Sequence, residues 1–223
     1  MEQLIKGTVA CIEQALTDAS VEPDRVFASS SFQTQSLPLL HILSTRFPEI
    51  RILFIDTGYL FSESLIFKEQ ITRELGLSVI TLRSEQSYAQ QIGPDGLPLY
   101  CSDTRHCCHL NKVLPLQNFL AGGDRWISGV RRDQTGTRAH MKPVITDLRG
   151  VVRIHPMLNW TARDVYQYIR DCKLPRHPLE NAGYSSIGCA PCTHKWSGSD
   201  SRNARWFGSQ KTECGLHTHN VKA

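Results

Sequence analysis

The sequence predicts an α/β protein in which a mostly parallel sheet is covered by helices on both faces. Short continuous apolar runs, typical of strands buried on both faces, recur through the first half of the chain. Between these runs lie longer stretches whose apolar residues repeat at helical spacing. Strands and helices that alternate in this way require crossover connections, which make consecutive strands parallel.

The first half of the chain supplies three strands and two helices. We expect buried strands at Val26–Ser29, Arg51–Ile55 and Ser78–Leu82. The stretches between them predict helices at Leu37–Arg46 and Ser62–Leu75, and a glycine after the second favours a helix end there.

The second half continues the pattern more weakly. Lys112–Leu120 is apolar on one side and predicts a helix, and Trp126–Gly129 predicts the next strand. A short β segment is expected at Val151–Ile154. A helix then follows over Asn159–Ile169, with Asn159 or Thr161 as its N-cap. The remainder is rich in Gly, Pro, Ser and His, so we expect a metal centre rather than a core to order it.

Three polar loops follow predicted strands: Ser29–Ser36, Asp56–Gly58 and Val130–Arg138. The carboxyl ends of parallel strands share one edge of a sheet, and ligands of such sheets bind beyond that edge. We therefore expect the three loops to lie together and to form a binding site.

The composition indicates a soluble protein with one main domain. The 223 residues suffice for a single core, and 40% hydrophobic with 21% charged residues is ordinary for a globular protein. We expect one α/β domain over residues 1–206 and a C-terminal tail over residues 207–223. A formal net charge of +4 is too small to indicate nucleic-acid binding.

The apolar runs are also too short to span a membrane, and the chain start lacks a basic segment followed by an apolar one. We therefore expect a cytoplasmic protein without a membrane partner. Eight cysteines in that reducing compartment indicate ligands or catalysts rather than disulfides.

Four of the cysteines form two pairs that are far apart in the chain: Cys107 with Cys108, and Cys189 with Cys192. Vicinal cysteines chelate one small ion awkwardly, because the short peptide link strains both sulfurs toward one point. A cubane cluster presents separate irons, so neighbouring thiolates can each take one. The pattern favours a [4Fe-4S] cluster, while zinc and redox-active thiols remain alternatives.

A fifth cysteine, Cys214, stands alone near the C-terminus. Lys211 and His217 favour its thiolate form and Glu213 opposes it, so the local sequence does not settle how readily it ionises. A lone thiolate on a short polar tail can act as a nucleophile, and a spare thiol is the alternative.

Two groups of arginines predict that the protein binds an anion. Arg131, Arg132 and Arg138 suit bidentate contacts with oxyanions, and surface ion pairs are the alternative interpretation. Arg202 and Arg205 form a second basic run closer to the C-terminus, where they can clamp the same anion.

Two of the polar loops give weaker signals. Ser29–Ser36 offers hydroxyl and N–H groups at a helix start, where a phosphate or sulfate can sit, but an ordinary polar turn fits equally well. The loop contains no glycine and is not a nucleotide-binding P-loop. Asp56–Gly58 can hydrogen-bond a ribose or a base, and it is also a common turn sequence.

Taken together, these stretches resemble the sulfonucleotide reductases, the assimilatory adenosine phosphosulfate and phosphoadenosine phosphosulfate reductases. The matching segments extend from Ser29 to Gly215. They are Ser30–Phe32, Leu53–Tyr59, Cys107–Lys112 with Pro115–Leu116, Gly129–Gln134, His155–Thr161, Gly183–Thr193 and Lys211–His217. The last three are long and specific.

The resemblance implies a Rossmann-like fold similar to the adenine-nucleotide α-hydrolases, with a five- or six-stranded sheet. It also implies reduction of adenosine 5'-phosphosulfate to sulfite and AMP in assimilatory sulfate reduction, the route to cysteine biosynthesis. Cys214 resembles the nucleophile that forms an S-sulfocysteine intermediate, which thioredoxin or glutaredoxin would discharge. Family members with the cluster cysteines usually take this substrate, and its 3'-phosphorylated form is the alternative.

The resemblance and the loop chemistry together assign the site residues. Substrate binding is predicted for Ser29, Ser30, Ser31, Phe32, Asp56, Thr57, Gly58, Lys112, Arg131, Arg132, Arg138, Arg202, Arg205 and His217. The [4Fe-4S] cluster is assigned to Cys107, Cys108, Cys189 and Cys192. Lys112 matches the lysine that links cluster and substrate electrostatically. Asn111 departs from the family, which often has arginine there, and so removes one charge near the cluster.

Two other classes fit the sequence less well. A related ATP-dependent tRNA-thiolating enzyme needs a glycine-containing pyrophosphate loop, which Ser29–Ser36 does not provide. A zinc-ribbon nucleic-acid module would carry a basic stripe, which the modest charge does not favour. The sequence leaves the oligomeric state open, including a homo-oligomer.

Overall fold

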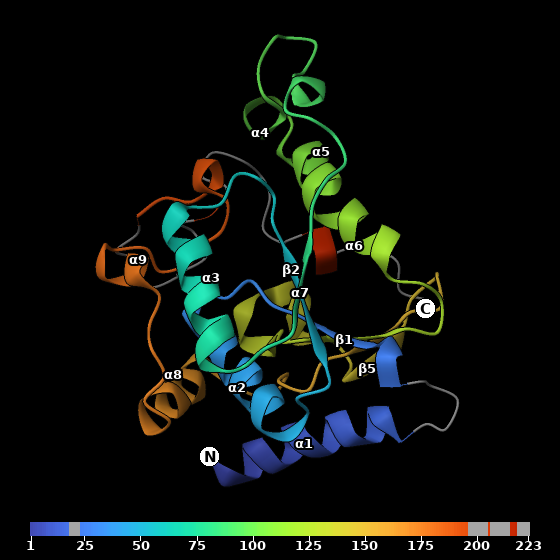
Figure 1. Ribbon diagram of the computed structural model, residues 1–223, viewed down its shortest axis with the longest axis vertical. Coiled ribbons are helices and arrows are strands. Elements are labelled where there is room, and N and C mark those ends of the chain that lie inside the picture. Colours follow the sequence, from blue (N-terminus) through green and yellow to red (C-terminus); the bar gives the residue numbers. More distant parts are fainter. Residues whose placement is uncertain (18–22, 196–204, 206–214, 218–223) are drawn as a thin grey trace.

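The computed structural model describes residues 1–17, 23–195, 205 and 215–217. Within these residues one sheet of six strands runs through the molecule in the order β3-β2-β1-β4-β6-β5 (Figure 1). The strands are β1 (Val26–Ser29), β2 (Arg51–Ile55), β3 (Val79–Leu82), β4 (Arg125–Ser128), β5 (Val144–Thr146) and β6 (Val152–Ile154). Every neighbouring pair is parallel except β5 with β6, which confirms the predicted fold class.

Helices connect and cover these strands. The longer ones are α1 (Glu2–Leu16), α2 (Leu37–Arg46), α3 (Ser62–Glu74), α6 (Leu114–Phe119) and α8 (Ala162–Asp171). The short ones are α4 (Leu99–Ser102), α5 (Thr104–Cys108), α7 (Gly136–Ala139) and α9 (Pro178–Asn181). None of the helices in the described ranges combines the length and the apolar character that crossing a membrane requires.

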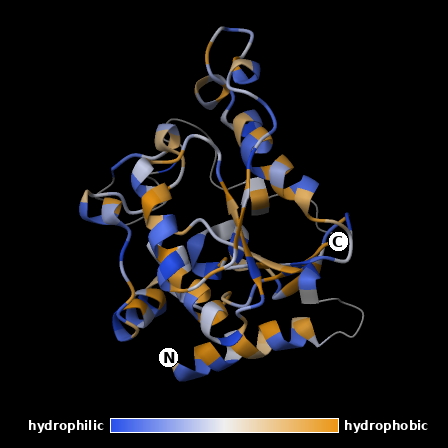
Figure 2. Ribbon diagram, viewed as in Figure 1, coloured by the Kyte–Doolittle hydropathy of each residue, from blue (hydrophilic) through white to orange (hydrophobic). Residues whose placement is uncertain are grey.

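The two faces of the sheet carry separate cores, because alternate strand residues point to opposite sides. Ala28, Ile127 and Ile154 pack with residues of α1, α2, α3 and α8. Phe27 and Trp126 pack on the other face with residues of α6. Figure 2 shows the central strands mostly in the colour of hydrophobic residues, whereas α1 alternates between both colours.

The strand order places a topological switch point beside β1. From β1 the chain adds β2 and β3 on one side, and then returns to add β4 on the other side of β1. The connections after β1 and β4 therefore diverge, which opens a crevice beyond the carboxyl ends of these two strands.

The structure corrects several predicted boundaries and adds elements that the sequence did not predict. The helix expected from Lys112 begins at Leu114, because a π-helical turn over His109–Val113 precedes it. The helix expected from Asn159 begins at Ala162, since Thr161 accepts the hydrogen bond of the Asp164 N–H and is the N-cap. Helix α1, strand β5 and the short helices α4, α5, α7 and α9 were not predicted. The region after α8 also buries the apolar side chains of Leu179 and Ile187, so packing contributes to its order.

Candidate active site

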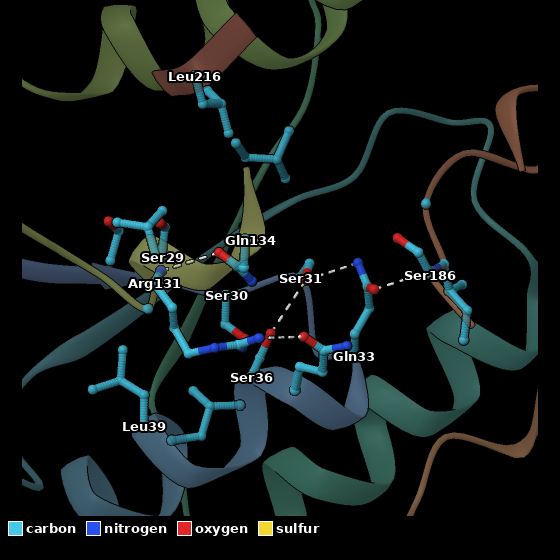
Figure 3. Close-up of a pocket in the computed structure, with 18 of the residues that line it drawn as sticks. Ser29, Ser30, Ser31, Gln33, Ser36, Leu39, Arg131, Gln134, Ser186 and Leu216 are labelled. Carbon is cyan, nitrogen blue, oxygen red and sulfur yellow. Dashed lines mark hydrogen bonds between the residues drawn. The ribbon is translucent and has the colours of Figure 1, made fainter. Parts of the chain in front are cut away.

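A cavity of about 560 Å³ lies at the switch point between β1 and β4. The loop after β1 contributes Ser29, Ser30 and Ser31, and the loop after β4 contributes Arg131 and Gln134, which face the same space in Figure 3. This volume suits a ligand of nucleotide size. Two of the three predicted loops therefore meet at one sheet edge.

Phe32 shapes the serine loop from inside the core. Its backbone adopts φ +53°, and its side chain is buried and packs edge-to-face on Phe54 with ring centroids 5.6 Å apart. The Phe32 N–H donates to Ser30 Oγ at 3.0 Å. Phe32 is absent from the described cavity wall, so its predicted contact with substrate stays a prediction, and its N–H fixes the Ser30 hydroxyl.

Arg131 is the most deeply buried cation in the described cavity wall, with 2% of its surface exposed. Its Nε donates to Asp133 Oδ1 and its Nη2 to Gln35 Oε1, both at 3.0 Å. Its Nη1 is buried and has no hydrogen-bond partner among the residues that the structure describes. A buried donor in this state suits an oxyanion ligand.

The other two arginines of this loop differ in position. Arg138 is buried, lines the cavity and donates to Gln134 Oε1. Arg132 does not line it and donates instead to Asn159 Oδ1 and, at 3.0 Å, to the Met141 carbonyl. The loop thus directs two of its three arginines toward the cavity.

Two cations from distant parts of the chain also line the cavity. Arg205 donates to the Ile187 carbonyl at 3.2 Å, and its guanidinium occupies the space where a Cβ on Gly188 would lie. Lys112 projects from the π-helical turn that precedes α6. These residues join the cavity to the segments that carry the paired cysteines.

The four paired cysteines lie close to one another and are all buried. Burial and the neighbouring Cys108, Cys189 and Cys192 raise the pKa of Cys107 to about 11. In the described ranges no three or more His, Cys, Asp or Glu side chains surround a single point as one metal ion would require. The seven described cysteines are free thiols.

The environment of Cys189 favours a thiolate despite its burial. Burial opposes the charged form, but the Lys112 ammonium, the Thr57 hydroxyl and Arg205 together lower the pKa of Cys189. Thr57 Oγ1 lies 3.2 Å from Cys189 Sγ. Lys112 therefore acts on a cysteine of the quartet and lines the cavity at the same time.

Asn111 provides a polar contact on the opposite cysteine pair. Its Nδ2 lies 3.6 Å from Cys107 Sγ and donates to the Cys107 carbonyl at 3.0 Å and to Gln91 Oε1 at 2.6 Å. Gln91 Oε1 also accepts from the Tyr59 hydroxyl at 3.2 Å. Four neighbouring buried thiols, with N–H and O–H donors beside two of the sulfurs, fit the donor set of an iron–sulfur cluster.

The loop Asp56–Gly58 contacts the cysteine segment, through Thr57 and Cys189. Asp56 accepts two hydrogen bonds from Arg83 at 2.8 and 3.0 Å, and one from the Gly58 N–H at 3.0 Å. Gly58 has φ +74°, a conformation that favours glycine. Asp56, Thr57 and Gly58 do not appear in the described cavity wall, so their predicted contact with substrate stays a prediction.

The C-terminal turn Gly215–His217 reaches the cavity. Leu216 lines it and packs with the core that contains Trp126, and Figure 3 shows it on the side opposite the serines. Arg153 donates to the Leu216 carbonyl at 3.2 Å and is itself held by buried Asp147 and by the Trp126 ring, 4.9 Å from its guanidinium. Cys214, Arg202 and the side chain of His217 lie outside the described residues, and their predicted roles stay predictions.

Sequence reasoning missed several polar residues that line the cavity or hold a segment that lines it. Gln35 holds Arg131, Ser128 lines the wall at the end of β4, and Arg153 holds the C-terminal turn. Ser128 could have been found, because it lies near the carboxyl end of a predicted strand, just before the loop. Gln35 and Arg153 depend on contacts between residues far apart in the chain, which local sequence does not show.

Known proteins share this architecture and sequence. Residues 25–195 match the phosphoadenosine phosphosulfate reductase domain. Adenosine 5'-phosphosulfate reductase of Rhodococcus opacus is 42% identical over 80% of this chain and 73% of its own, and that of Bacillus mycoides is 34% identical over 97% and 92%. The crystal structure of phosphoadenylyl-sulfate reductase from Candida auris, a phosphate complex, has TM-score 0.65 at 20% identity, covering 82% of this chain and 88% of that chain. The chain belongs to the phosphoadenosine phosphosulfate reductase domain family.

Proposed function

We propose that this protein reduces adenosine 5'-phosphosulfate to sulfite and AMP in assimilatory sulfate reduction, with thioredoxin or glutaredoxin as reductant. One observation carries the proposal: a cavity of nucleotide size, lined by buried guanidinium groups, adjoins four buried thiols, and Lys112 belongs to both. The names of the relatives at 34–42% identity support the non-phosphorylated substrate. The described cysteines are free thiols, which supports a cytoplasmic location because that compartment keeps thiols reduced.

The cationic wall of the cavity reduces the electrostatic repulsion that opposes the reaction. Attack by a thiolate on a sulfate group brings two anions together. Arg131 and Arg138 are buried at the site and have already lost most of their water, so they are suited to neutralise phosphate and sulfate oxygens. Lys112 and Arg205 add positive charge from the side of the cysteine quartet.

Cys214 is the proposed nucleophile, on a tail that comprises residues 207–223. Its thiolate attacks the sulfur of the substrate, the bond from sulfur to the bridging oxygen breaks, and AMP leaves with that electron pair. The product is an S-sulfocysteine. A thiolate of the reductant then attacks Sγ of Cys214 and sulfite leaves. The second thiol of the reductant resolves the mixed disulfide, so the reductant supplies two electrons and ends as a disulfide.

Cys107, Cys108, Cys189 and Cys192 are the residues that would hold a [4Fe-4S] cluster. When bound, such a cluster supplies fixed charge beside the substrate site. Thr57 and Asn111 are placed to donate to the sulfurs of Cys189 and Cys107, which would orient these ligands. Lys112 then balances charge between this centre and the cavity.

The substrate assignment is tested by a direct comparison of the two nucleotides. Purified protein with reduced thioredoxin is given adenosine 5'-phosphosulfate or its 3'-phosphorylated form, and sulfite is measured over time. We expect a higher kcat/KM with the non-phosphorylated substrate. Faster turnover of the phosphorylated form would instead identify the alternative reductase, and absence of sulfite from both would reject the proposed function.

Leu216 gives a second test, because it lies two residues after Cys214 and docks at the cavity. The change Leu216→Ala removes most of this buried contact, worth about 1–1.5 kcal/mol. We expect formation of the S-sulfocysteine, followed by rapid quench and mass spectrometry, to slow by about tenfold. Leu97→Ala, at a side chain that is 52% exposed, is the matched control and is expected to leave the rate unchanged. An unaltered rate in the Leu216 variant would show that this docking does not position the nucleophile.

A further inference from the structure

Three side chains form a row at the carboxyl ends of neighbouring strands. Ser29 of β1 and Ser128 of β4 are paired in the sheet register, and both line the cavity. On the far side of β4, Arg153 pairs with Trp126 and Ile154 with Ile127. Histidine 155 follows in that register, and its Nδ1 lies 2.8 Å from Ser128 Oγ.

The first serine of the row shows how a ring N–H can fix a hydroxyl. Trp126 Nε1 lies 2.8 Å from Ser29 Oγ. An indole nitrogen only donates, so the Ser29 hydroxyl accepts this bond. Its own hydrogen can therefore turn toward the cavity and donate to a ligand.

The surroundings of the His155 ring keep it uncharged at neutral pH. It is 1% exposed, and burial, followed by the positive charges of Arg153 and Arg138, lowers the pKa of His155 to about 4. At neutral pH the ring is uncharged and carries one proton. Its Nε2 is buried and makes no hydrogen bond within the described part of the chain.

The position of that one proton decides what Ser128 can do. If it lay on Nε2, a buried N–H would be left without a hydrogen-bond partner, in a ring on which Arg153 and Arg138 already act as positive charges. If it lies on Nδ1, the ring donates to Ser128 Oγ, and Nε2 keeps a lone pair, which the nearby positive charges stabilise. The second arrangement is the more stable one, and it matches the bond between Trp126 and Ser29.

We propose that His155 is a positioning residue that holds the Ser128 hydroxyl as a hydrogen-bond donor toward an acceptor oxygen of the nucleotide in the cavity. The inference rests on the proposed function, because it takes the ligand to be a nucleotide. It adds Ser128 to the residues assigned to substrate binding, and it adds His155 as the residue that positions Ser128.

The tautomer is tested first, on the wild-type protein without ligand. Long-range proton–nitrogen NMR correlations distinguish the two neutral forms of a histidine ring, and loss of one ring signal in a His155→Asn spectrum assigns it. We expect the proton on Nδ1 at neutral pH. A ring protonated on Nε2 would overturn the proposal, whatever the ligand is.

The coupling between the two residues is tested by calorimetric titration with AMP. An uncharged hydrogen bond is worth about 1 kcal/mol, so Ser128→Ala is expected to weaken AMP binding by about fivefold. His155→Gln should weaken it similarly, since its amide matches the far ring nitrogen. His155→Asn places an amide near Nδ1 and is expected to bind AMP within about twofold of the wild type.

The double variant separates positioning from a general loss of structure. When Ser128→Ala is already present, adding His155→Gln should cause no further loss of AMP affinity, because the hydroxyl that it positions is gone. Independent, additive losses would overturn the proposal. His41→Gln is the control, since His41 also makes a 2.8 Å bond through Nδ1, to the Tyr168 hydroxyl, away from the cavity.

Failure of the proposed function looks different from failure of this inference. If the wild type does not bind AMP, the nucleotide assignment is wrong, and the proposal for Ser128 as its donor is overturned with it. If the wild type binds AMP and all variants bind equally well, the proposed function survives and the role of His155 is rejected. Thermal unfolding of each variant shows whether a loss of affinity reflects a loss of folding.

Discussion

Replacement of Cys214 by serine is expected to reduce sulfite release by about a thousandfold or more, while the protein keeps the brown colour of an iron–sulfur centre. A serine hydroxyl does not ionise near neutral pH and cannot form the thiosulfonate bond. The cationic wall that includes Arg131, Arg138 and Lys112 does not depend on this thiol, so AMP should still bind. The quartet of buried cysteines is also left intact.

Two measurements test the prediction for the Cys214 variant. Sulfite is assayed with reduced thioredoxin, and quenched protein is digested to find the peptide that carries an added SO3 group. In the wild type the added mass should lie on the peptide that contains Cys214, and in the variant it should be absent. Cys172→Ser is the control, because Cys172 follows α8 and is not part of the quartet. Sulfite release that persists in the Cys214 variant would exclude the covalent mechanism.

The predictable part of the fold was the part set by buried strands. Val26–Ser29 and Arg51–Ile55 have the predicted bounds, because a strand that is covered on both faces must be apolar along its whole length. Strand β5 has only three residues and is half exposed, so no such run marks it. Helix α1 begins without a side-chain cap, and its start therefore lacks the usual signal.

The candidate site was predictable to the extent that topology decides it. Parallel strands bring the loops after β1 and β4 to one edge, and the cavity lies there. Local sequence could not show that Phe32 would turn inward at φ +53°, or that Asp56 would be held by Arg83. Both outcomes depend on packing partners that lie elsewhere in the chain.

The buried arginines of the site also depend on partners that hold them in place. Arg131 and Arg138 are both buried, and Asp133 is the carboxylate that pairs with the first of them. Burying a guanidinium costs free energy unless hydrogen bonds and opposite charge compensate it. Glutamines 35 and 134 supply neutral acceptors, so the wall remains positive and attracts an anionic ligand.

Replacement of Cys189 by serine is expected to remove the proposed iron–sulfur centre. Loss of even an outer partner weakens metal binding by about 10- to 100-fold, and loss of a direct ligand should cost more. Cys189 is buried, and Lys112 and Thr57 favour its thiolate form, which is the form that a cluster ligand requires. We expect anaerobically purified variant protein to lose its visible absorbance, with iron and sulfide falling together.

Cys101→Ser is the matched control, because Cys101 is an exposed thiol close in sequence to the first cysteine pair. It should keep the iron, the sulfide and the colour of the wild type. If the wild type instead contained zinc and no sulfide, the cluster would be rejected while the role of Cys214 could still hold, since that thiol is separate from the quartet. If Cys189→Ser kept a full complement of iron and sulfide, Cys189 would not be a ligand. Its contacts with Thr57 and Lys112 would then need another explanation, such as a thiolate that faces the substrate directly.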